Sequence, residues 1–172
     1  EVLATGSKGN CYLLTSGTAR ILLDCGLPYK KTLELLNFEL PSAVLVTHEH
    51  QDHAKAVADF IKHGADVYLT PGTERACTFD SKFAYRIMPI FENGKFFLRN
   101  GEDGIGVVPF ACQHDAAEPV NFAIDDDEDN ILYVTDTGNV DLESCSRLSG
   151  RRTKFTKILL ETNYSEDVLR EA

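Results

Sequence analysis

The stretch at residues 44–62, VLVTHEHQDHAKAVADFIK, constrains this chain more than any other part of it. Its apolar start, residues 44–46, predicts a buried strand. Four potential metal ligands follow directly: His48, His50, Asp52 and His53. Imidazoles and a carboxylate packed this closely are costly to bury without a partner, and a bound cation satisfies all of them. The sequence therefore predicts a metal site at a strand end rather than a scatter of surface histidines.

The spacing of these ligands divides them into two pairs. His48 and His50 are two residues apart in an extended segment, so their side chains point the same way and can hold one ion. Asp52 and His53 come after a bend and are expected to face a second ion or the attacking water. Asp52 could instead cap the following helix, whose apolar stripe ends before Gly64.

Length and composition favour one soluble domain spanning residues 1–172. At 43% hydrophobic residues, the chain can bury a substantial core. No apolar run is long enough to span a bilayer, and no leader pattern opens the sequence, so we expect no membrane partner. Because Glu1 is not a start methionine and already reads as part of a strand, we expect the first few natural residues to be missing.

The five cysteines contain no CxxC pair, which argues against a disulfide framework and against a cysteine zinc site. A reducing, cytoplasmic setting fits this pattern. Cys11, Cys25, Cys112 and Cys145 are interpreted as small buried apolar residues. Cys25 follows Asp24, and a thiolate ligand there is the alternative.

The net charge of -10 argues against general binding to nucleic acid, although it leaves room for a local basic groove. The most basic stretch contains Arg151, Arg152, Lys154 and Lys157, and we interpret it as a solvated loop. The acidic run at residues 125–130 is interpreted as a hairpin tip, because a calcium loop needs a central Gly and a distal Glu.

Strands and helices are expected to place further polar residues at strand ends. Strands are predicted over 1–5, 11–15, 19–24, 44–46, 67–70, 85–90, 95–98, 105–112, 121–124, 131–134 and 157–161. Helices are predicted over 29–36, after His53, over 73–79 and from 166. A hairpin turn is predicted at Asn93-Gly94. The Gly-rich turn at residues 6–10 is not a P-loop, since it lacks the G-x-x-x-x-G-K-[ST] spacing and a following helix.

The strand-end residues form one candidate constellation: His48, His50, Asp52, His53, His114 and Asp136, with Asp24 behind them. Three imidazoles suit one zinc-like ion, and Asp52 and His53 with a bridging carboxylate suit a second. Two ions that share a carboxylate imply a bridging hydroxide, which is a nucleophile at neutral pH.

These motifs resemble those of the metallo-β-lactamase superfamily. THEHQDH matches the signature H-x-H-x-D-H, and Asp24 in LLDCG, His114 in CQHDAAEP and Asp136 in VTDTG follow in the family's order. With the opening ATGSKGNCYLL, the chain is similar to a small bacterial branch of single-domain hydrolases that includes 5′-to-3′ DNA exonucleases and phosphodiesterases. The resemblance implies an α/β (α+β) fold, a four-layer αββα sandwich with a dinuclear site on its rim.

The resemblance also implies roles for the residues. His48, His50 and His114 hold the first of two divalent ions, Zn or Mn. Asp52, His53 and Asp136 hold the second, with Asp136 bridging. Asp24 orients the ligands from behind, and Asp52 accepts the proton of the attacking water.

The family normally supplies one more His to the second ion, from a loop after the last strands. His63, at the end of a helix, is interpreted as a partner of the helix dipole instead. We therefore expect either that the C-terminal segment lies beyond Ala172, or that the second site is weak.

The leading functional hypothesis is a metal-dependent phosphodiesterase or nuclease with DNA or a nucleotide as substrate. Hydrolysis of a thioester, lactone or β-lactam uses the same nucleophile on a carbonyl and is the first alternative. Iron redox chemistry at a single ion and a non-catalytic nucleotide-binding module with an incomplete second metal site are the others. The oligomeric state is left open.

Overall fold

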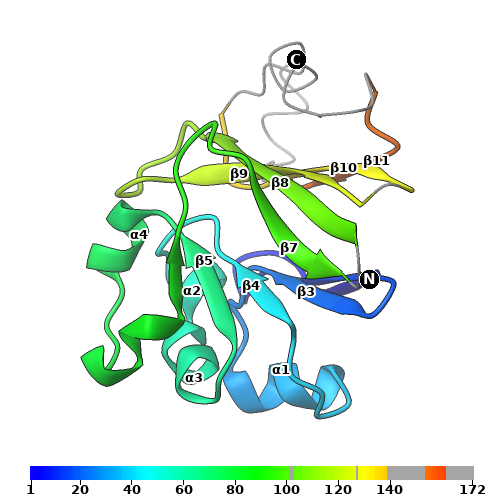
Figure 1. Cartoon of the computed structure of the whole chain (residues 1–172). Helices are drawn as coiled ribbons and strands as arrows, with labels where there is room; N and C mark the ends of the chain where they lie inside the picture. Colours follow the sequence, from blue (N-terminus) through cyan, green and yellow to red (C-terminus); the bar gives the residue numbers. More distant parts are fainter. Residues whose placement is uncertain (101–102, 127, 139–153, 162–172) are drawn as a thin grey trace, which may run out of the picture.

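Two β-sheets lie face to face in the computed structural model, which describes residues 1–100, 103–126, 128–138 and 154–161 (Figure 1). Sheet A is ordered β1 to β6, with bounds Val2–Ala4, Cys11–Ser16, Ala19–Leu23, Ala43–Leu45, Asp66–Leu69 and Ile87–Pro89. Sheet B is ordered β11-β10-β9-β8-β7, with bounds Lys157–Leu160, Asn130–Val134, Val120–Asp125, Asp103–Ala111 and Phe96–Asn100. The prediction of an α/β fold built on two stacked sheets is confirmed.

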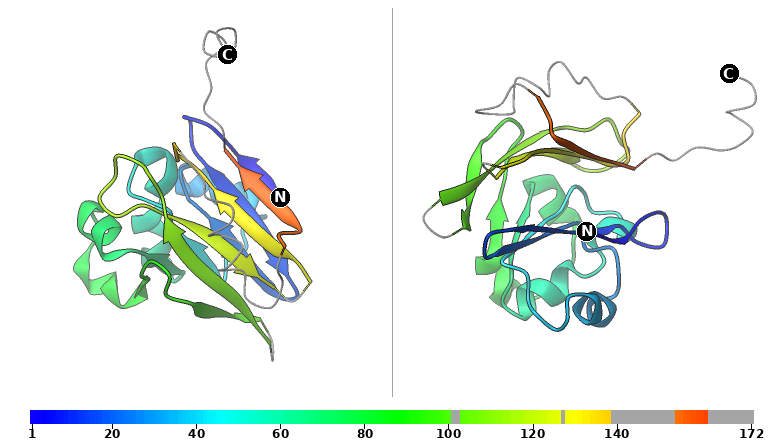
Figure 2. Two further views of the ribbon diagram at one scale, coloured as in Figure 1. Left: turned by 90° about the horizontal axis from the view of Figure 1, so that it is seen from above. Right: turned by 90° about the vertical axis from the view of Figure 1, so that its right-hand side faces the viewer.

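Helices cover the outer face of sheet A (Figure 2). They are α1, α2, α3, α4 and the 3-10 helix η1, with bounds Tyr29–Leu35, Gln51–Ala54, Val57–Lys62, Pro71–Ala76 and Ser81–Arg86. The helical layer expected over sheet B and the helix predicted from residue 166 lie outside the described residues.

The strand directions bring the predicted ligands to one edge. Strands β3, β4, β5 and β6 pair in parallel, whereas β1, β2 and β3 pair antiparallel. The carboxyl ends of the parallel strands therefore meet at one edge of sheet A. In sheet B, β7 to β10 are antiparallel and β11 runs parallel to β10. The β8–β9 connection and the end of β10 reach the same edge (Figure 1).

The central strands are buried on both faces, as their continuous apolar runs predict. In β3, Ile21 and Leu23 pack between the two sheets, whereas Leu22 packs against the helices. In β4, Val44 packs with the helices, and Leu45 packs between the sheets. Burial on both faces holds the carboxyl ends of these strands rigidly in place.

The helix after the metal motif differs from its prediction. It begins at Gln51 rather than after His53, and it is interrupted between α2 and α3. The interruption has a clear cause: the Asp52 carbonyl accepts from Asn10 N at 2.6 Å, and Ala56 N donates instead to Cys25 O at 3.0 Å. The N-cap of α2 is His50, so the interpretation of Asp52 as a cap is wrong.

The hairpin predicted at Asn93-Gly94 is also wrong. Strand β6 pairs with β5 in sheet A, whereas β7 pairs with β8 in sheet B. A turn does form there, since Gly94 N donates to Phe91 O at 2.9 Å, but it carries the chain from one sheet to the other. The sequence predicts the turn itself, but the two flanking strands pair with β5 and β8 rather than with each other.

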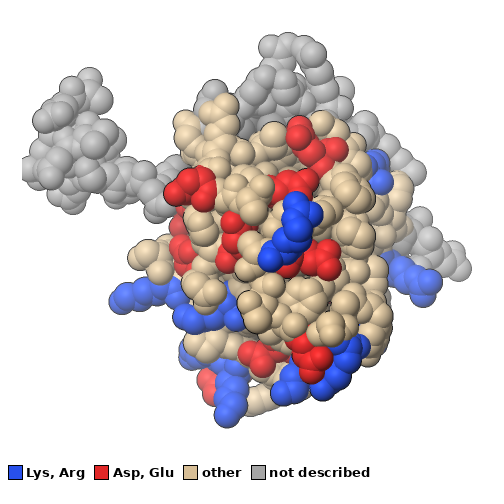
Figure 3. Space-filling model, turned by 90° about the vertical axis from the view of Figure 1, so that its left-hand side faces the viewer, with Lys and Arg blue, Asp and Glu red and all other residues tan. Residues whose placement is uncertain are grey.

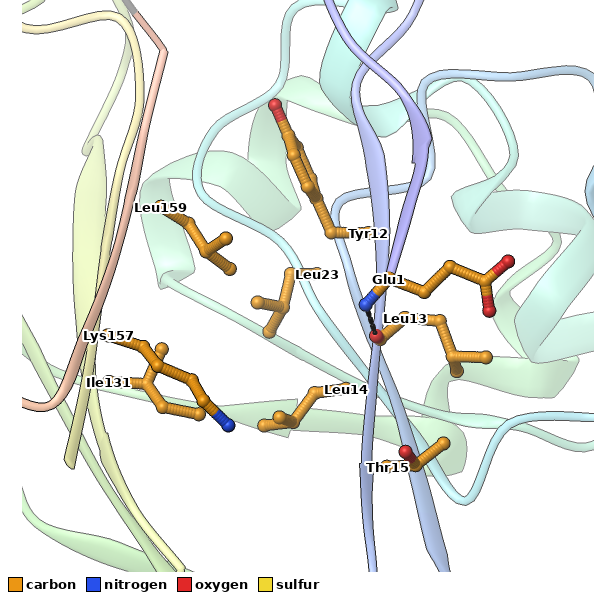
Figure 4. A pocket seen from close by; sticks show the side chains of 9 residues that line it. All are labelled: Glu1, Tyr12, Leu13, Leu14, Thr15, Leu23, Ile131, Lys157 and Leu159. Atoms are coloured by element: carbon orange, nitrogen blue, oxygen red, sulfur yellow. Dashed lines mark hydrogen bonds between the residues drawn. The ribbon is translucent and has the colours of Figure 1, made fainter. Parts of the chain in front are cut away.

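A pocket opens between the sheets at the edge formed by β2 and β11 (Figure 4). Polar and apolar groups both line it, and Leu14, Leu23 and Leu159 face one another across it. The amino group of Glu1 donates to Leu13 O at 2.8 Å at its rim. No candidate metal ligand lines this pocket. Within the described ranges, no helix is long and apolar enough to cross a membrane.

The remaining predictions can be compared directly with the structure. Cys11 and Cys25 are fully buried free thiols, Cys112 is half-buried, and Cys145 lies outside the described residues. The acidic run does form the β9–β10 turn, where Asp126 N donates to Asp129 O at 3.1 Å. In the basic stretch, Lys157 pairs with Asp129. Arg151 and Arg152 lie outside the described residues.

Candidate metal centre

The structure brings all six predicted ligands together in two groups that share Asp136. His48, His50, His114 and Asp136 form the first group, and Asp52, His53 and Asp136 form the second. Within each group, one ligand atom from every residue lies within 4.8 Å of the others. This is the division into two ion sites, with Asp136 common to both, that the resemblance implies.

The first group joins the two sheets. His48 and His50 come from the segment after β4, and His114 comes from the β8–β9 connection, with its Nε2 3.0 Å from His50 Nδ1. Asp136, after β10, places Oδ2 3.5 Å from His48 Nε2 and 3.7 Å from His114 Nε2. Nitrogen and oxygen atoms therefore converge on one point from both sheets.

The second group lies deeper. His53 is fully buried, and its Nε2 lies 3.0 Å from Asp136 Oδ2 and 3.8 Å from Asp52 Oδ2. The Asp52 side chain is 31% exposed, so it forms the solvent side of this group. That position gives its carboxylate access to water, as a proton acceptor requires.

Asp24 orients the imidazole of His53 from behind. Its carboxylate is fully buried and accepts from Thr47 N at 2.8 Å, Tyr133 Oη at 2.7 Å and Thr47 Oγ1 at 3.0 Å. The fourth contact is His53 Nδ1, at 2.8 Å from Asp24 Oδ2. A carboxylate that accepts these donors keeps the proton of His53 on Nδ1, which leaves Nε2 free to bind a cation.

The same carboxylate acts on His48 through Thr47. The Thr47 hydroxyl donates its one hydrogen to Asp24 and lies 3.0 Å from His48 Nδ1, so its oxygen accepts a hydrogen bond from the N–H group at that nitrogen. His48 Nε2 is then left with a lone pair directed into the site. This atom is buried and has no hydrogen-bond partner among the described residues, with Asp136 Oδ2 3.5 Å away, as expected for a metal ligand.

Two acidic residues of the site adopt strained backbone conformations. Asp24 has φ of 56° and Asp136 has φ of 43°, a region that residues other than Gly rarely adopt. Such strain costs about 1–3 kcal/mol per residue and persists where the surroundings enforce it. Asp24 directly follows β3, Asp136 follows β10 after Thr135, and the left-handed turn aims both carboxylates at the imidazoles.

The charges of the protein groups reinforce one another. The neighbouring imidazoles of His48 and His53 hold the pKa of Asp136 far below its ordinary value. Burial disfavours the charged form of His53, but Asp24 and Asp136 outweigh it and raise its pKa to about 10, so a cation bound at Nε2 would displace a proton. Burial and the neighbouring His48 lower the pKa of His114. The two groups thus contain the carboxylates of Asp52 and Asp136 and several imidazole nitrogens, a set of ligand atoms that suits zinc, iron or manganese.

Three chain segments meet behind the second group with almost no free space. Asn10 O accepts from Gly26 N at 2.9 Å, and Cys25 N donates to His53 O at 2.7 Å. A Cβ built on Gly26 would lie 1.7 Å from Asp52 O. Only Gly allows this close approach, so Gly26 fixes the position of Asp52 relative to Asp24.

The loop that carries His114 is fastened to sheet A by two carboxylates. Ala117 N donates to Glu49 Oε1 at 2.7 Å, and Gly72 N donates to Glu118 Oε2 at 2.6 Å. The Glu118 carbonyl also accepts from Thr70 Oγ1 at 2.8 Å. These contacts hold the last imidazole of the first group in place across the gap between the sheets.

Sequence reasoning missed the supporting residues Asn10, Thr47, Tyr133, Glu49 and Glu118. Thr47 and Glu49 lie inside the metal motif, so their position was a usable signal. The other candidates fall outside the centre. Burial raises the pKa of Cys25 well above its ordinary value, so this thiol is a core residue rather than a ligand. His63 Nδ1 contacts Asp59 O at 2.8 Å at the end of α3, far from the ligand groups in the fold.

Charges of both signs mix on the face seen in Figure 3. Acidic side chains predominate in its middle and upper parts, where basic side chains also lie, and basic side chains gather towards its lower part among a few acidic ones, on the side of the helices. An anionic substrate approaching this face meets carboxylates as well as cations, so its binding depends on local donors within the site.

The fold has two stacked mixed sheets, and the His and Asp groups lie at their common edge. This combination is typical of metallo-hydrolases. The family model described as "Beta-lactamase superfamily domain" matches residues 19–169, so this chain belongs to the β-lactamase superfamily. Its fold is the metallo-β-lactamase fold, as predicted.

Similar proteins support this assignment. The chain is 32% identical over 180 residues to exodeoxyribonuclease WalJ of Streptococcus pneumoniae and to exodeoxyribonuclease YycJ of Bacillus anthracis. In both cases the match covers 99% of this chain and 64% of the relative's length. The solved structure of TTHA1623 in a di-iron-bound form has a TM-score of 0.55 and 24% identity, and the match covers 83% of this chain and 77% of that one.

Proposed function

We propose that this chain is the metal-binding part of a hydrolase that cleaves phosphodiester bonds in DNA. The observation that carries the proposal is the sharing of Asp136 by two ligand groups. One carboxylate common to both groups would hold two bound ions close together, the arrangement suited to in-line displacement at phosphorus. The names of the relatives, both exodeoxyribonucleases, support DNA as the substrate.

The proposed ligands follow the two groups. His48, His50, His114 and Asp136 hold the first ion, and Asp52, His53 and Asp136 hold the second. When bound, the two divalent ions lower the pKa of a shared water and stabilise the charge that develops on the phosphate oxygens. The orphaned Nε2 of His48 and the fixed Nε2 of His53 are the nitrogen atoms that fit this role.

Other roles are proton acceptance, orientation of the imidazoles and positioning of Asp52. Asp52, on the solvent side, accepts the proton of the attacking water. Asp24 keeps the imidazoles of His48 and His53 in the ligating tautomer, the first through Thr47. The close packing at Gly26 keeps Asp52 at a fixed distance from these groups.

The test is cleavage of a single-stranded DNA oligonucleotide and of a chromogenic phosphodiester, each with added Zn²⁺ or Mn²⁺ and with chelator. We expect metal-dependent cleavage that Asp52→Asn reduces strongly. A thioester, a lactone and a β-lactam are assayed in parallel. Hydrolysis of one of these, with no cleavage of any phosphodiester, would overturn the proposal.

A further inference from the structure

The turn between β1 and β2, residues 6–10, brings one residue to the site, Asn10, although the turn does not match the P-loop pattern. Asn10 ends this turn and is fully buried. Its Nδ2 lies 3.1 Å from His53 Nε2, the nitrogen assigned to the second ion. An amide therefore reaches among side chains that are otherwise imidazoles and carboxylates.

The orientation of this amide is settled by its other end. Asn10 Oδ1 accepts from Gly6 N at 3.0 Å, and a backbone N–H can only donate. The oxygen therefore faces the turn, and the Nδ2 donors face the site. A flipped Asn10 amide would place its Nδ2 against Gly6 N, so two donors would face each other and the Gly6 N–H would lose its acceptor.

The backbone of Asn10 is fixed as firmly as its side chain. Its N–H donates to Asp52 O at 2.6 Å, and its carbonyl accepts from Gly26 N at 2.9 Å. Gly9 has φ of 141° and approaches Gly26 so closely that a Cβ on Gly9 would lie 2.6 Å from Gly26 O. A donor held this rigidly needs no reorganisation when charge develops beside it.

We propose that the Asn10 amide is a hydrogen-bond donor to an anionic phosphate oxygen of the substrate at the second ion group. The proposal rests on the phosphodiesterase function. Once His53 Nε2 engages a cation, its lone pair is no longer available to the amide, and an oxygen atom bound beside it becomes the natural acceptor. A donor is needed there because Asp52 and Asp136 line the same group and repel a phosphate.

In this role Asn10 contacts the substrate directly, so its loss should weaken phosphate binding as well as activity. Asn10→Ala should leave zinc content per chain unchanged, since Asn10 is not a ligand. It should weaken binding of inorganic phosphate to the zinc-loaded protein about tenfold, the scale of one hydrogen bond to a charged group. The value of kcat/KM for the chromogenic phosphodiester should fall about 100-fold.

Two further variants separate this role from a structural one. Asn10→Asp keeps the acceptor for Gly6 N but removes the donor, so it should retain folding and zinc while losing phosphate binding. Ser7→Ala changes an exposed residue of the same turn and should behave as wild type.

Phosphate binding is measured by calorimetry, zinc by elemental analysis and folding by thermal unfolding. If wild type cleaves phosphodiesters while Asn10→Ala binds phosphate as tightly as wild type, the inference fails and the proposed function stands. If zinc and phosphate binding fall together in Asn10→Ala, Asn10 positions His53 instead, and the inference also fails. If wild type neither cleaves phosphodiesters nor binds phosphate, the proposed function fails and takes the inference with it.

Discussion

The two ligand groups share one carboxylate but are built in different ways. His53, in the second group, is fully buried and held by Asp24 inside sheet A. His114, in the first group, is 21% exposed and reaches the site on a connection from sheet B. Both groups take Asp136 from the end of β10 in sheet B, so both require the two sheets to dock. The first group also takes His114 from sheet B, whereas Asp52 and His53 of the second come from α2, on the side of sheet A.

The supports of the two groups differ accordingly. Behind the second group, Asp24 gathers buried hydrogen bonds from Thr47, Tyr133 and His53. Beside the first group, Glu49 and Glu118 bind backbone N–H groups at the junction of the sheets. Different variants can therefore affect both groups together, the buried residues behind the second group, or the contacts at the junction beside the first group.

Asp136→Ala should have the largest effect, because it removes the carboxylate common to both groups. Replacing outer-shell partners of metal ligands costs about 10–100-fold in metal affinity or activity, so loss of a shared ligand should exceed 100-fold. Elemental analysis and phosphodiester cleavage measure both effects. Retention of two ions by this variant would show that Asp136 does not bridge them.

Asp24→Ala should destabilise the fold most strongly, because Asp24 and His53 form a fully buried pair. Removing one partner of such a pair costs about 3–5 kcal/mol. The free energy of unfolding, measured with urea on metal-free protein, checks this value. Tyr133→Phe is the matched control, since it removes one of the donors to Asp24 and should cost about 1–3 kcal/mol. Equal losses in the two variants would contradict the central role given to Asp24.

Gly26→Ala should lower both stability and activity, because its Cβ would collide with the Asp52 backbone. Overpacking of this kind typically costs about 1–3 kcal/mol. Gly64→Ala provides the comparison: no atom lies within 4 Å of its Cβ, but φ is 100°. Gly64→Ala should lose stability through backbone strain while keeping normal kcat/KM. A Gly26→Ala protein with unchanged kcat/KM would show that the close approach does not position Asp52.

Glu118→Gln should have the smallest effect, confined to the first group. The amide keeps an acceptor for Gly72 N but loses the charge, so the loop with His114 is held less firmly. We expect metal affinity of the first site to fall about tenfold, at the lower end for an outer-shell change. Competition with a chromogenic chelator resolves the two affinities. A drop in the affinity of the second site alone would contradict this assignment.

Much of the fold could be predicted from the sequence because its signals are local. Apolar runs marked β3 and β4, and the ligands stood at their ends, as for His48 and Asp24. The break between α2 and α3 could not be predicted, because it depends on a hydrogen bond that the backbone N–H of Asn10, distant in the sequence, donates to the Asp52 carbonyl. The partners of β6 and β7 were likewise decided by long-range pairing.

The ligand types of the site and one supporting residue, Asp24, could be predicted, but the other supporting residues could not. His and Asp at metal-binding spacing carry a chemical signal of their own. Tyr133 and Asn10 carry none, since a buried Tyr and a turn Asn are ordinary residues until the fold brings them to Asp24 and His53. Their roles follow only from distances across the chain.

The most direct test of the shared-carboxylate site is the metal content per chain of protein purified without chelators, measured by elemental analysis. The account predicts two equivalents of a divalent metal, and a loss of both in Asp136→Ala. One equivalent in wild type that survives in Asp136→Ala would contradict it, because the two groups would then not share that carboxylate as a ligand.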